Sequence, residues 1–337
     1  MSSMRATKQI LEPKPSWLTQ LAAVALAAIL LAGCGSGSKT TNSKTGTTSS
    51  PPRKASAKTH STPTVHVSRP PAASYPKVIP GGLSAGSPAF VPVAKWHGQT
   101  VAWIAHLPSG VQMLSFDQHH LTLHLHSGTL DAGASGWRFG PEISHSELPR
   151  VVAAFNGGFR LAVGVGGFES NGRVAVPLRA GLASIVTYAN GSTDVGSWRG
   201  EVPAAGQRVA SVRQNLTLLI DHGHPAATVD CVSCWGATLG GVVDPARAAL
   251  GVAANGHLVW AAGEHVTPAT LADALVHAHV VRAAELDINP EWVAGYLYAH
   301  HSFHSPPVPL AVVQGQVGIP GEFLVPWSRD FFTVVVR

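Results

Sequence analysis

The sequence predicts an α+β fold in which strands predominate, with a strand-rich mixed sheet and a few packed helices in a single globular domain over residues 75–337. Short apolar runs of four to seven residues recur along this part of the chain, separated by Gly, Pro, Asn or Asp, which is the pattern of strands. One segment has the apolar spacing of a helix. A domain of this length can bury a full hydrophobic core.

Residues 1–33 have the organisation of a signal peptide. Arg5, Lys8 and Lys14 precede an unbroken apolar run of twelve residues, 21–32, which is too short to span a bilayer as a helix and typical of a signal-peptide core. The run ends in Leu-Ala-Gly before Cys34, and so resembles the lipobox of bacterial lipoproteins. We expect Cys34 to be lipidated, with palmitate among its acyl chains, and to hold the protein on the outer side of the cell membrane. An ordinary secretory signal with a chance cysteine is the alternative.

Residues 34–74 are expected to form the lipidated cysteine and a disordered tether. From Gly35 to about Pro71 the chain consists mainly of Ser, Thr, Gly, Pro and Lys, without an acidic residue. Such a segment cannot bury enough apolar surface to offset the entropy of ordering it. The positive charge of this segment suits contact with an anionic surface polymer or with lipid headgroups. Alternatively, the segment is only a solvated spacer.

The charge of the chain is divided between its two parts. Residues 1–116 hold eleven Lys and Arg against one acidic residue, whereas residues 117–337 hold twelve Arg against seventeen acidic residues. The basic character therefore belongs to the N-terminal part, which argues against nucleic acid as a partner of the domain. No lysine follows Lys95, so Schiff-base, Walker-type and Ser-Lys chemistry are excluded there. Any anion must be bound by Arg, His or backbone N–H groups.

The predicted strands are the apolar runs of the domain: Val101–Ala105, Leu121–Leu125, Val151–Phe155, Ser184–Tyr188, Leu216–Ile220, Leu258–Ala262 and Phe331–Val336. Asn190-Gly191 and Asn255-Gly256 lie between apolar runs and predict hairpin turns.

The predicted helix follows Thr267, a suitable N-cap, and has Pro268 at its first position. Leu271, Ala274, Leu275 and Ala278 then recur at helical spacing, and Val280-Val281 resumes a strand.

Cys231 and Cys234 remain as a pair if Cys34 is lipidated. In an exported protein this spacing favours a short-loop disulfide, with a thioredoxin-like redox motif or half of a zinc site as the alternatives. A redox motif normally opens a helix after a strand, and zinc would need a second ligand pair. Here Trp235-Gly236 follows instead.

Histidines recur in the strand that contains Leu121–Leu125. Alternation places His120, Thr122, His124 and His126 on one face and the leucines on the other. Two such histidines could bind zinc, but we expect the polar face of an edge strand. We predict neither a metal site nor a cofactor.

Four separated pieces carry the strongest functional pattern. The strand Val151–Phe155 runs into Asn156-Gly157-Gly158-Phe159, where two glycines allow a tight turn and close approach of a ligand. Arg213-Gln214-Asn215 is expected to introduce another strand. Arg247 precedes the apolar run that ends before Asn255. After the helix, Glu285-Leu-Asp287 lies at a strand end, and alternation predicts that the two carboxylates share a face.

In this order, the pieces resemble the phosphodiester glycosidase family over roughly Val151 to Trp292. The matching motifs are the Asn-Gly-Gly-Phe turn, Arg247 to Gly251, the helix led by Thr267, and Leu286-Asp287. Many members continue Leu-Asp with Gly-Gly-Gly-Ser, whereas this chain has Ile-Asn-Pro-Glu-Trp at 288–292.

The resemblance implies hydrolysis of the bond between a sugar and the phosphate of a glycosyl phosphodiester, in a cell-wall or exopolysaccharide polymer. It implies Asp287 as nucleophile or base, with Glu285 or Glu169 as its partner. Arg247 would hold the phosphate, unless it forms a structural ion pair with Asp287. The remaining substrate-binding candidates lie in the turn and just after Asp287: Asn156, Gly157, Gly158 and Asn289.

A non-catalytic lipoprotein that binds a glycan or wall polymer would use the same arginine and aromatic residues without turnover. A solute-binding lipoprotein fits less well, because such proteins usually have two lobes of repeated βα units. The sequence does not define an oligomeric state.

Overall fold

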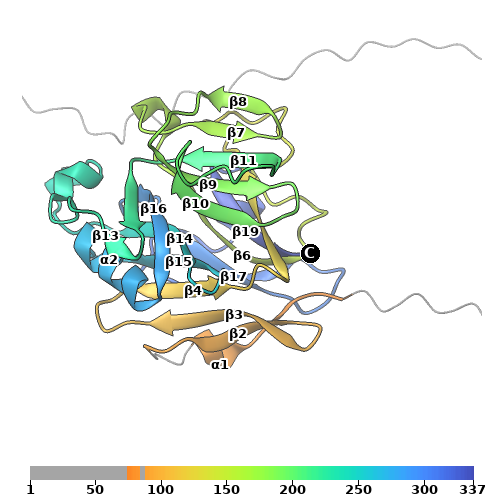
Figure 1. Cartoon of the computed structure of the whole chain (residues 1–337). Coiled ribbons are helices and arrows are strands. Elements are labelled where there is room, and N and C mark those ends of the chain that lie inside the picture. The colour runs from red at the N-terminus through yellow and green to blue at the C-terminus, as the bar shows by residue number, and fades with distance from the viewer. Residues whose placement is uncertain (1–73, 84–87) are drawn as a thin grey trace, which may run out of the picture. The chain divides into compact units, whose positions relative to one another are not determined.

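The computed structural model describes residues 74–83 and 88–337, and Figure 1 shows how their elements are arranged. Their strands form three sheets with antiparallel pairing. The α-helices of this part of the chain are α1 (Pro80–Leu83) and α2 (Pro268–His277), so the strand-rich α+β prediction is confirmed. No helix among the described residues is long and apolar enough to cross a membrane. The predicted signal peptide, Cys34 and the tether up to residue 73 lie outside the described residues.

The nine-stranded sheet has the strand order β1-β2-β3-β4-β15-β14-β16-β12-β13. Its strands are β1 (Lys77–Val78), β2 (Val91–Trp96), β3 (Gln99–His106), β4 (Gln112–Phe116), β12 (Leu218–Asp221), β13 (His224–Pro225), β14 (Arg247–Ala253), β15 (Leu258–Gly263) and β16 (Val280–Ile288). Helix α2 packs on one face of this sheet, because its buried Leu271 and Leu275 share a core cluster with Ala249 and Val259.

The β9 sheet has the order β10-β9-β11-β7-β8, and Figure 1 shows it in green above β4 and β15. Its strands are β7 (Phe168–Ser170), β8 (Arg173–Val176), β9 (Ala183–Tyr188), β10 (Thr193–Ser197) and β11 (Val209–Gln214).

The β6 sheet has the order β18-β17-β6-β19-β5. Its strands are β5 (Leu121–His126), β6 (Val151–Asn156), β17 (Gly295–Ala299), β18 (Val308–Ala311) and β19 (Phe331–Val336). Short 3-10 turns lie in the connections: η2 (Leu161–Val163), η3 (Val232–Trp235), η4 (Leu239–Gly241) and η5 (Glu322–Leu324).

The predicted hairpins and helix form as expected. Strands β9 and β10 pair across Asn190-Gly191, and β14 and β15 pair across Asn255-Gly256. The Oγ1 atom of Thr267 accepts the N–H of Thr270 at 3.1 Å, which caps α2. One strand starts later than predicted: Leu216 has a positive φ of 50°, a conformation that interrupts an extended strand, and β12 begins only at Leu218.

The main core is shared by the three sheets: it includes Leu114 of the nine-stranded sheet, Leu123 of the β6 sheet and Ile185 of the β9 sheet. The ring of Phe155 on β6 stacks on Trp260 of β15 at 5.3 Å and lies 5.8 Å from Phe332 of β19, between ring centroids. All three rings are almost fully buried. A Cβ atom on Gly295 would lie 2.2 Å from the ring of Trp260, so β17 needs glycine where this ring packs against it.

Candidate functional site

The Asn-Gly-Gly-Phe turn follows the end of β6 and is held by the residue before β19. The N–H of Gly157 donates to the backbone oxygen of Asp330 at 3.0 Å, and the N–H of Gly158 donates to Asp330 Oδ2 at 3.2 Å. A Cβ on Gly157 would lie 2.1 Å from Asp330 Oδ2, and one on Gly158 would lie 2.7 Å from Arg213 Cζ. The sequence led us to expect that a ligand approaches these glycines. In the structure, Asp330 and Arg213 occupy that space.

A buried ion pair joins the β9 sheet to the β6 sheet at this turn. Arg213 donates from Nε to Asp330 Oδ2 at 2.8 Å and from Nη2 to Oδ1 at 3.0 Å. Arg213 also donates to the backbone oxygens of Gln214 and Phe159. The side chains are 1% and 0% exposed. Burial alone would lower the pKa of Arg213, but the charge of Asp330 raises it, so the guanidinium stays charged.

Asp287 lies beside the turn and binds a different arginine. Its N–H donates to the oxygen of Gly157 at 2.8 Å, and its Oδ1 accepts the N–H of Ile288 at 2.9 Å. Arg329 Nη2 donates to Asp287 Oδ2 at 2.5 Å. Burial raises the pKa of Asp287 to about 7, although the charge of Arg329 acts to lower it. A carboxyl with such a pKa can accept or release a proton near neutral pH.

Arg329 connects Asp287 to the loop before β6. Its Nε donates to Asp131 Oδ2, and Asp131 Oδ1 accepts the N–H of Leu161 at 3.1 Å. The guanidinium lies 4.7 Å from the ring centroid of Trp292, a cation–π arrangement. Because Trp292 is partly exposed while Arg329 is buried, the indole ring forms the outer side of this group. Arg329 Nη1 has no hydrogen-bond partner among the described residues.

Arg247 pairs with Glu285 rather than with Asp287. Its Nη1 donates to Glu285 Oε1 at 2.7 Å and to the oxygen of Trp235 at 2.8 Å. Both charged side chains are fully buried. Their remaining polar atoms, Nε and Nη2 of Arg247 and Oε2 of Glu285, find no partner among the described residues. Burial raises the pKa of Glu285 to about 8, against the opposing charge of Arg247.

A β-bulge explains why the two carboxylates bind different arginines. Strand β14 pairs Arg247 with Ile288 and Ala249 with Glu285, so two residues of β16 lie opposite one residue of β14. A bulge breaks the alternation of side chains and is common next to functional sites. The simple alternation used in the sequence therefore does not hold between Glu285 and Asp287.

The three asparagines of this region bond to backbone groups. Asn156 Nδ2 donates to the oxygen of Gly157 at 3.2 Å, and its buried Oδ1 finds no partner in the described part of the chain. Asn289 has a positive φ of 78° and accepts the N–H of Leu239 through Oδ1 at 2.9 Å. Asn215 donates to the oxygen of Glu285 at 2.7 Å. Asn289 and Asn215 thus fix the backbone around β16.

Glu169 is not brought to this group. Strand β7 pairs Glu169 with Val212 of β11, and residues paired across a sheet project from the same face. Arg213 follows Val212 and so projects from the opposite face, where it meets Asp330. Arg213 and Gln214 end β11 and Asn215 follows it, whereas the sequence led us to expect these three residues before a strand.

Sequence reasoning missed Arg329, Asp330 and Asp131 as members of the group. A signal was available for two of them: Arg329 and Asp330 directly precede the apolar run Phe331–Val336, and charged residues at the start of a buried strand need partners. Those partners are distant in sequence, which the chain alone does not reveal.

The cysteine and histidine pairs have structural partners. Cys231 and Cys234 form a disulfide with a Cα–Cα distance of 5.4 Å, as the favoured prediction stated. It precedes Trp235, whose oxygen accepts from Arg247. In β5, an edge strand as predicted, His124 Nδ1 and His126 Nε2 lie 2.8 and 3.2 Å from the carboxylate of Glu147.

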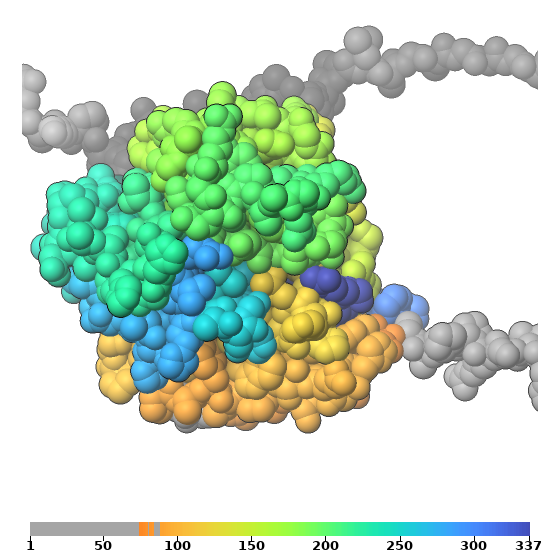
Figure 2. Space-filling model, in the orientation of Figure 1, coloured from red at the N-terminus to blue at the C-terminus, as the bar shows by residue number. Residues whose placement is uncertain are grey.

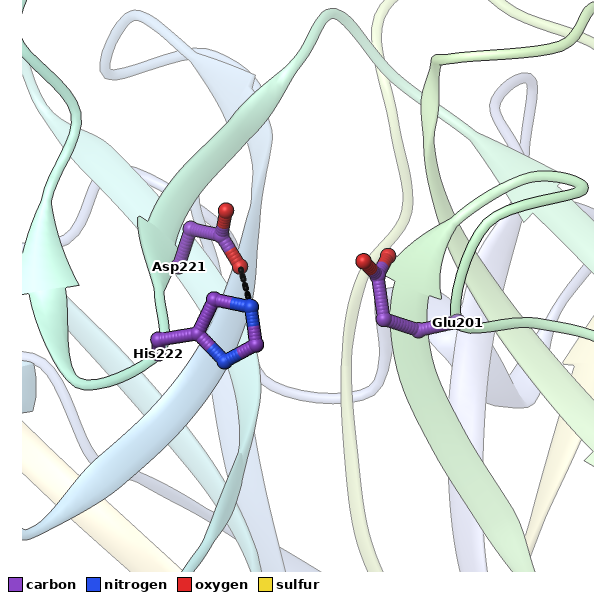
Figure 3. A group of neighbouring side chains, drawn as sticks. All are labelled: Glu201, Asp221 and His222. Atoms are coloured by element: carbon purple, nitrogen blue, oxygen red, sulfur yellow. Dashed lines mark ion pairs between the residues drawn. The ribbon is translucent and has the colours of Figure 1, made fainter.

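A separate group of possible metal ligands lies on the surface. Figure 3 shows Asp221 and His222 side by side with Glu201 facing them, and one ligand atom from each lies within 4.8 Å of the others. All three residues are exposed, and Glu201 Oε2 already accepts the N–H of Ser197 at 2.8 Å. This group shares no residue with the site around Asp287.

The chain matches no family model and no curated protein sequence. Among solved structures, it is similar to the catalytic domain of a zebrafish N-acetylglucosamine-1-phosphodiester alpha-N-acetylglucosaminidase, auto-inhibited by its pro-peptide, with 13% identity and a TM-score of 0.42 over 81% of this chain and 85% of that chain. It is also similar to a hypothetical protein from Synechocystis, with 13% identity and a TM-score of 0.41 over 75% of this chain and 65% of that chain. These likenesses are at the level of the fold.

Proposed function

We propose that the chain hydrolyses the bond between the anomeric carbon of a sugar and the phosphate of a glycosyl phosphodiester. The supporting observation is the arrangement at the ends of β6 and β16. There, the carboxyl of Asp287, whose pKa is raised to about 7, contacts Arg329, and Arg329 lies under the partly exposed Trp292. A carboxyl, a guanidinium and an aromatic ring side by side suit a sugar that carries a phosphate.

Each of these groups has a distinct role in the proposal. Asp287 acts at the anomeric carbon as nucleophile or base, since cleavage passes through a positively charged, oxocarbenium-like state that a carboxylate stabilises. Arg329 binds the phosphate through Nη1, which has no partner among the described residues, because guanidinium forms strong charge-assisted bonds to phosphate oxygens. The ring of Trp292 packs against the sugar.

The phosphate-binding role moves from Arg247 to Arg329 in this proposal. Arg247 is fully buried and bonded to Glu285, so it could reach a substrate only if the structure rearranged. The carboxylate of Glu285 accepts from Arg247 and serves, with it, to position β16. A separate acid for the leaving group is not required, because a phosphate monoester leaves readily.

A non-catalytic protein that binds a glycan or wall polymer is the alternative function. One observation favours it: Asp287 and Arg329 are only 6% and 5% exposed and already satisfy one another. An active site must open this contact to admit substrate, whereas a binding module could use Trp292 alone.

The experiment is a hydrolysis assay on the purified full chain with methyl phosphodiesters of glucose 1-phosphate, mannose 1-phosphate and N-acetylglucosamine 1-phosphate. We expect free sugar and methyl phosphate from at least one of them. Arg329→Lys should lower turnover strongly, because an ammonium cannot reproduce the planar guanidinium. Asp194→Asn, at a partly exposed ion pair with Arg282, is the matched control and should keep full activity. Binding without cleavage by the unmodified chain would support the alternative function instead.

We also propose that the domain acts outside the cell on a lipid anchor at Cys34. The support is the lipobox-like sequence that precedes this cysteine. Cys34→Ala should abolish incorporation of labelled palmitate and move the protein out of the membrane fraction. Unchanged labelling and fractionation would contradict the anchor.

A further inference from the structure

A second polar cavity lies between β5 and the β9 sheet, away from Asp287. Its volume is about 330 Å³, which suits a small ligand such as one sugar unit. Figure 2 shows the dark blue C-terminal residues at the surface between green and gold parts of the chain, where the rim of this cavity lies. Its lining includes His124, Arg138, Phe139, Asn190, Arg208 and Arg337.

The charged side chains that line this cavity are arginines. Arg138, Arg208 and Arg337 are exposed at its rim, and no Asp or Glu is among the described residues that line it. Arg337 is fixed by hydrogen bonds from Nε to the oxygen of Leu121 at 3.0 Å and from Nη1 to the oxygen of Asn190 at 3.1 Å. Within the described residues, Arg138 and Arg208 form no ion pair. The rim is therefore positive and available to an anion.

Two lining residues, His124 and Phe139, form an aromatic pair, and the guanidinium of Arg138 lies over the Phe139 ring, 5.2 Å from its centroid. The rings of His124 and Phe139 stack with centroids 4.1 Å apart. His124 Nδ1 lies 2.8 Å from Glu147 Oε1, and a carboxylate only accepts hydrogen bonds, so Nδ1 carries the proton and Nε2 is left as an acceptor. The Glu147 carboxylate is itself held by Ser144 Oγ at 2.9 Å and Thr333 Oγ1 at 3.2 Å.

The lining also offers neutral polar groups. Thr122, Asn171, Asn190 and Ser211 supply hydroxyl and amide groups around the same cavity. Sugars are bound by this combination, in which an aromatic ring packs on the apolar face of the pyranose while hydroxyl and amide groups bond its rim.

We propose that this cavity binds an acidic saccharide, that is, a sugar unit that carries a phosphate or a carboxylate. Arg138 and Arg208 bind the anionic group, and His124 Nε2 accepts a hydroxyl of the sugar. The site is independent of the hydrolysis proposed at Asp287. In a polymer of such units it would hold a segment that is not being cleaved.

The test is isothermal titration calorimetry on the full chain with glucose 6-phosphate, glucuronate, glucose and inorganic phosphate as separate probes. We expect both acidic sugars to bind, with affinity that falls as salt is added, and glucose to bind far more weakly. Arg208→Glu and Arg138→Glu should each weaken binding by about tenfold, the loss of one charge-assisted contact. Arg199→Glu makes the same charge change at another exposed arginine and should leave binding unchanged.

Asp287→Asn separates this proposal from the proposed hydrolysis. Binding of the acidic sugars should survive in Asp287→Asn, whether or not the wild type cleaves any diester. Equal binding by Arg208→Glu, Arg138→Glu and the wild type would overturn the proposal, as would loss of binding in Asp287→Asn alone. Binding of inorganic phosphate without either acidic sugar would show an anion site that does not recognise a saccharide, and would overturn it as well.

Discussion

Removal of the negative charge of Asp330 should destabilise the domain far more than removal of a surface carboxylate. The Asp330 side chain is fully buried and accepts two hydrogen bonds from Arg213 and one from Gly158. Asp330→Asn keeps the shape of the side chain but leaves the Arg213 guanidinium buried without its counter-charge. Breaking a buried ion pair in this way lowers the free energy of unfolding by about 3–5 kcal/mol.

The comparison requires an Arg–Asp pair with a similar nitrogen–oxygen distance nearer the surface. Arg282 and Asp194 also lie 2.8 Å apart, but their side chains are 22% and 28% exposed, and such pairs contribute about 1 kcal/mol or less. We therefore expect Asp330→Asn to lower the melting temperature by about 6–20 °C, at about 2–4 °C per kcal/mol, and Asp194→Asn by a few degrees at most.

The assay is urea unfolding followed by tryptophan fluorescence, with thermal melts of the same proteins. Nine tryptophans report on the chain, and Trp260 in the main core gives a direct signal of unfolding. If the free energies of unfolding of Asp330→Asn and Asp194→Asn differ by less than 1 kcal/mol, the buried pair of Arg213 and Asp330 does not stabilise the contact between the β9 sheet and the β6 sheet as proposed.

Two further predictions concern the turn and the buried carboxyls. Gly157→Ala should lower the free energy of unfolding by about 1–3 kcal/mol, because the new Cβ would lie 2.1 Å from Asp330 Oδ2. Gly140→Ala, which has open space around its Cβ, should leave the free energy of unfolding nearly unchanged. Equal urea midpoints for the two variants would contradict this prediction. Burial raises the pKa of Glu285 to about 8 and that of Asp287 to about 7, so the folded state retains protons that the unfolded chain releases at lower pH. The contribution of these two carboxyls to the free energy of unfolding should therefore fall as pH rises from about 5 to 8. Glu285→Gln should remove part of this fall, and a pH slope identical to that of the wild type would argue against the raised pKa.

The local features of this fold could be predicted from sequence. The helix after Thr267 and the hairpins at Asn190-Gly191 and Asn255-Gly256 depend on capping and turn chemistry within a few residues. The runs that form β5, β6 and β19 were recognisable because both their composition and their flanking residues are typical of strands. These signals act over short distances along the chain.

The partners within the site could not be predicted in the same way. Arg213 and Asp330 are 117 residues apart, and Arg329 and Asp287 are 42 residues apart. Motifs mark Asp287 and the glycine turn in the sequence, but the sequence led us to expect Arg247 beside Asp287, as the phosphate ligand or, alternatively, as its partner in an ion pair. A bulge of one residue in β16 changed that pairing, and a bulge depends on the register with β14, which no local pattern reports.

In the proposed reaction, water attacks the anomeric carbon of the sugar and not the phosphorus. Hydrolysis in ¹⁸O-labelled water distinguishes these two sites of attack. The substrate is whichever methyl glycosyl phosphodiester the full chain cleaves, and mass spectrometry of the released methyl phosphate is the readout. Cleavage at the anomeric carbon by Asp287 leaves both original bridging oxygens on phosphorus, so the methyl phosphate should contain no ¹⁸O, and Asp287→Asn should release it orders of magnitude more slowly. Methyl phosphate that carries one ¹⁸O atom, or a wild-type rate from Asp287→Asn, would contradict the account.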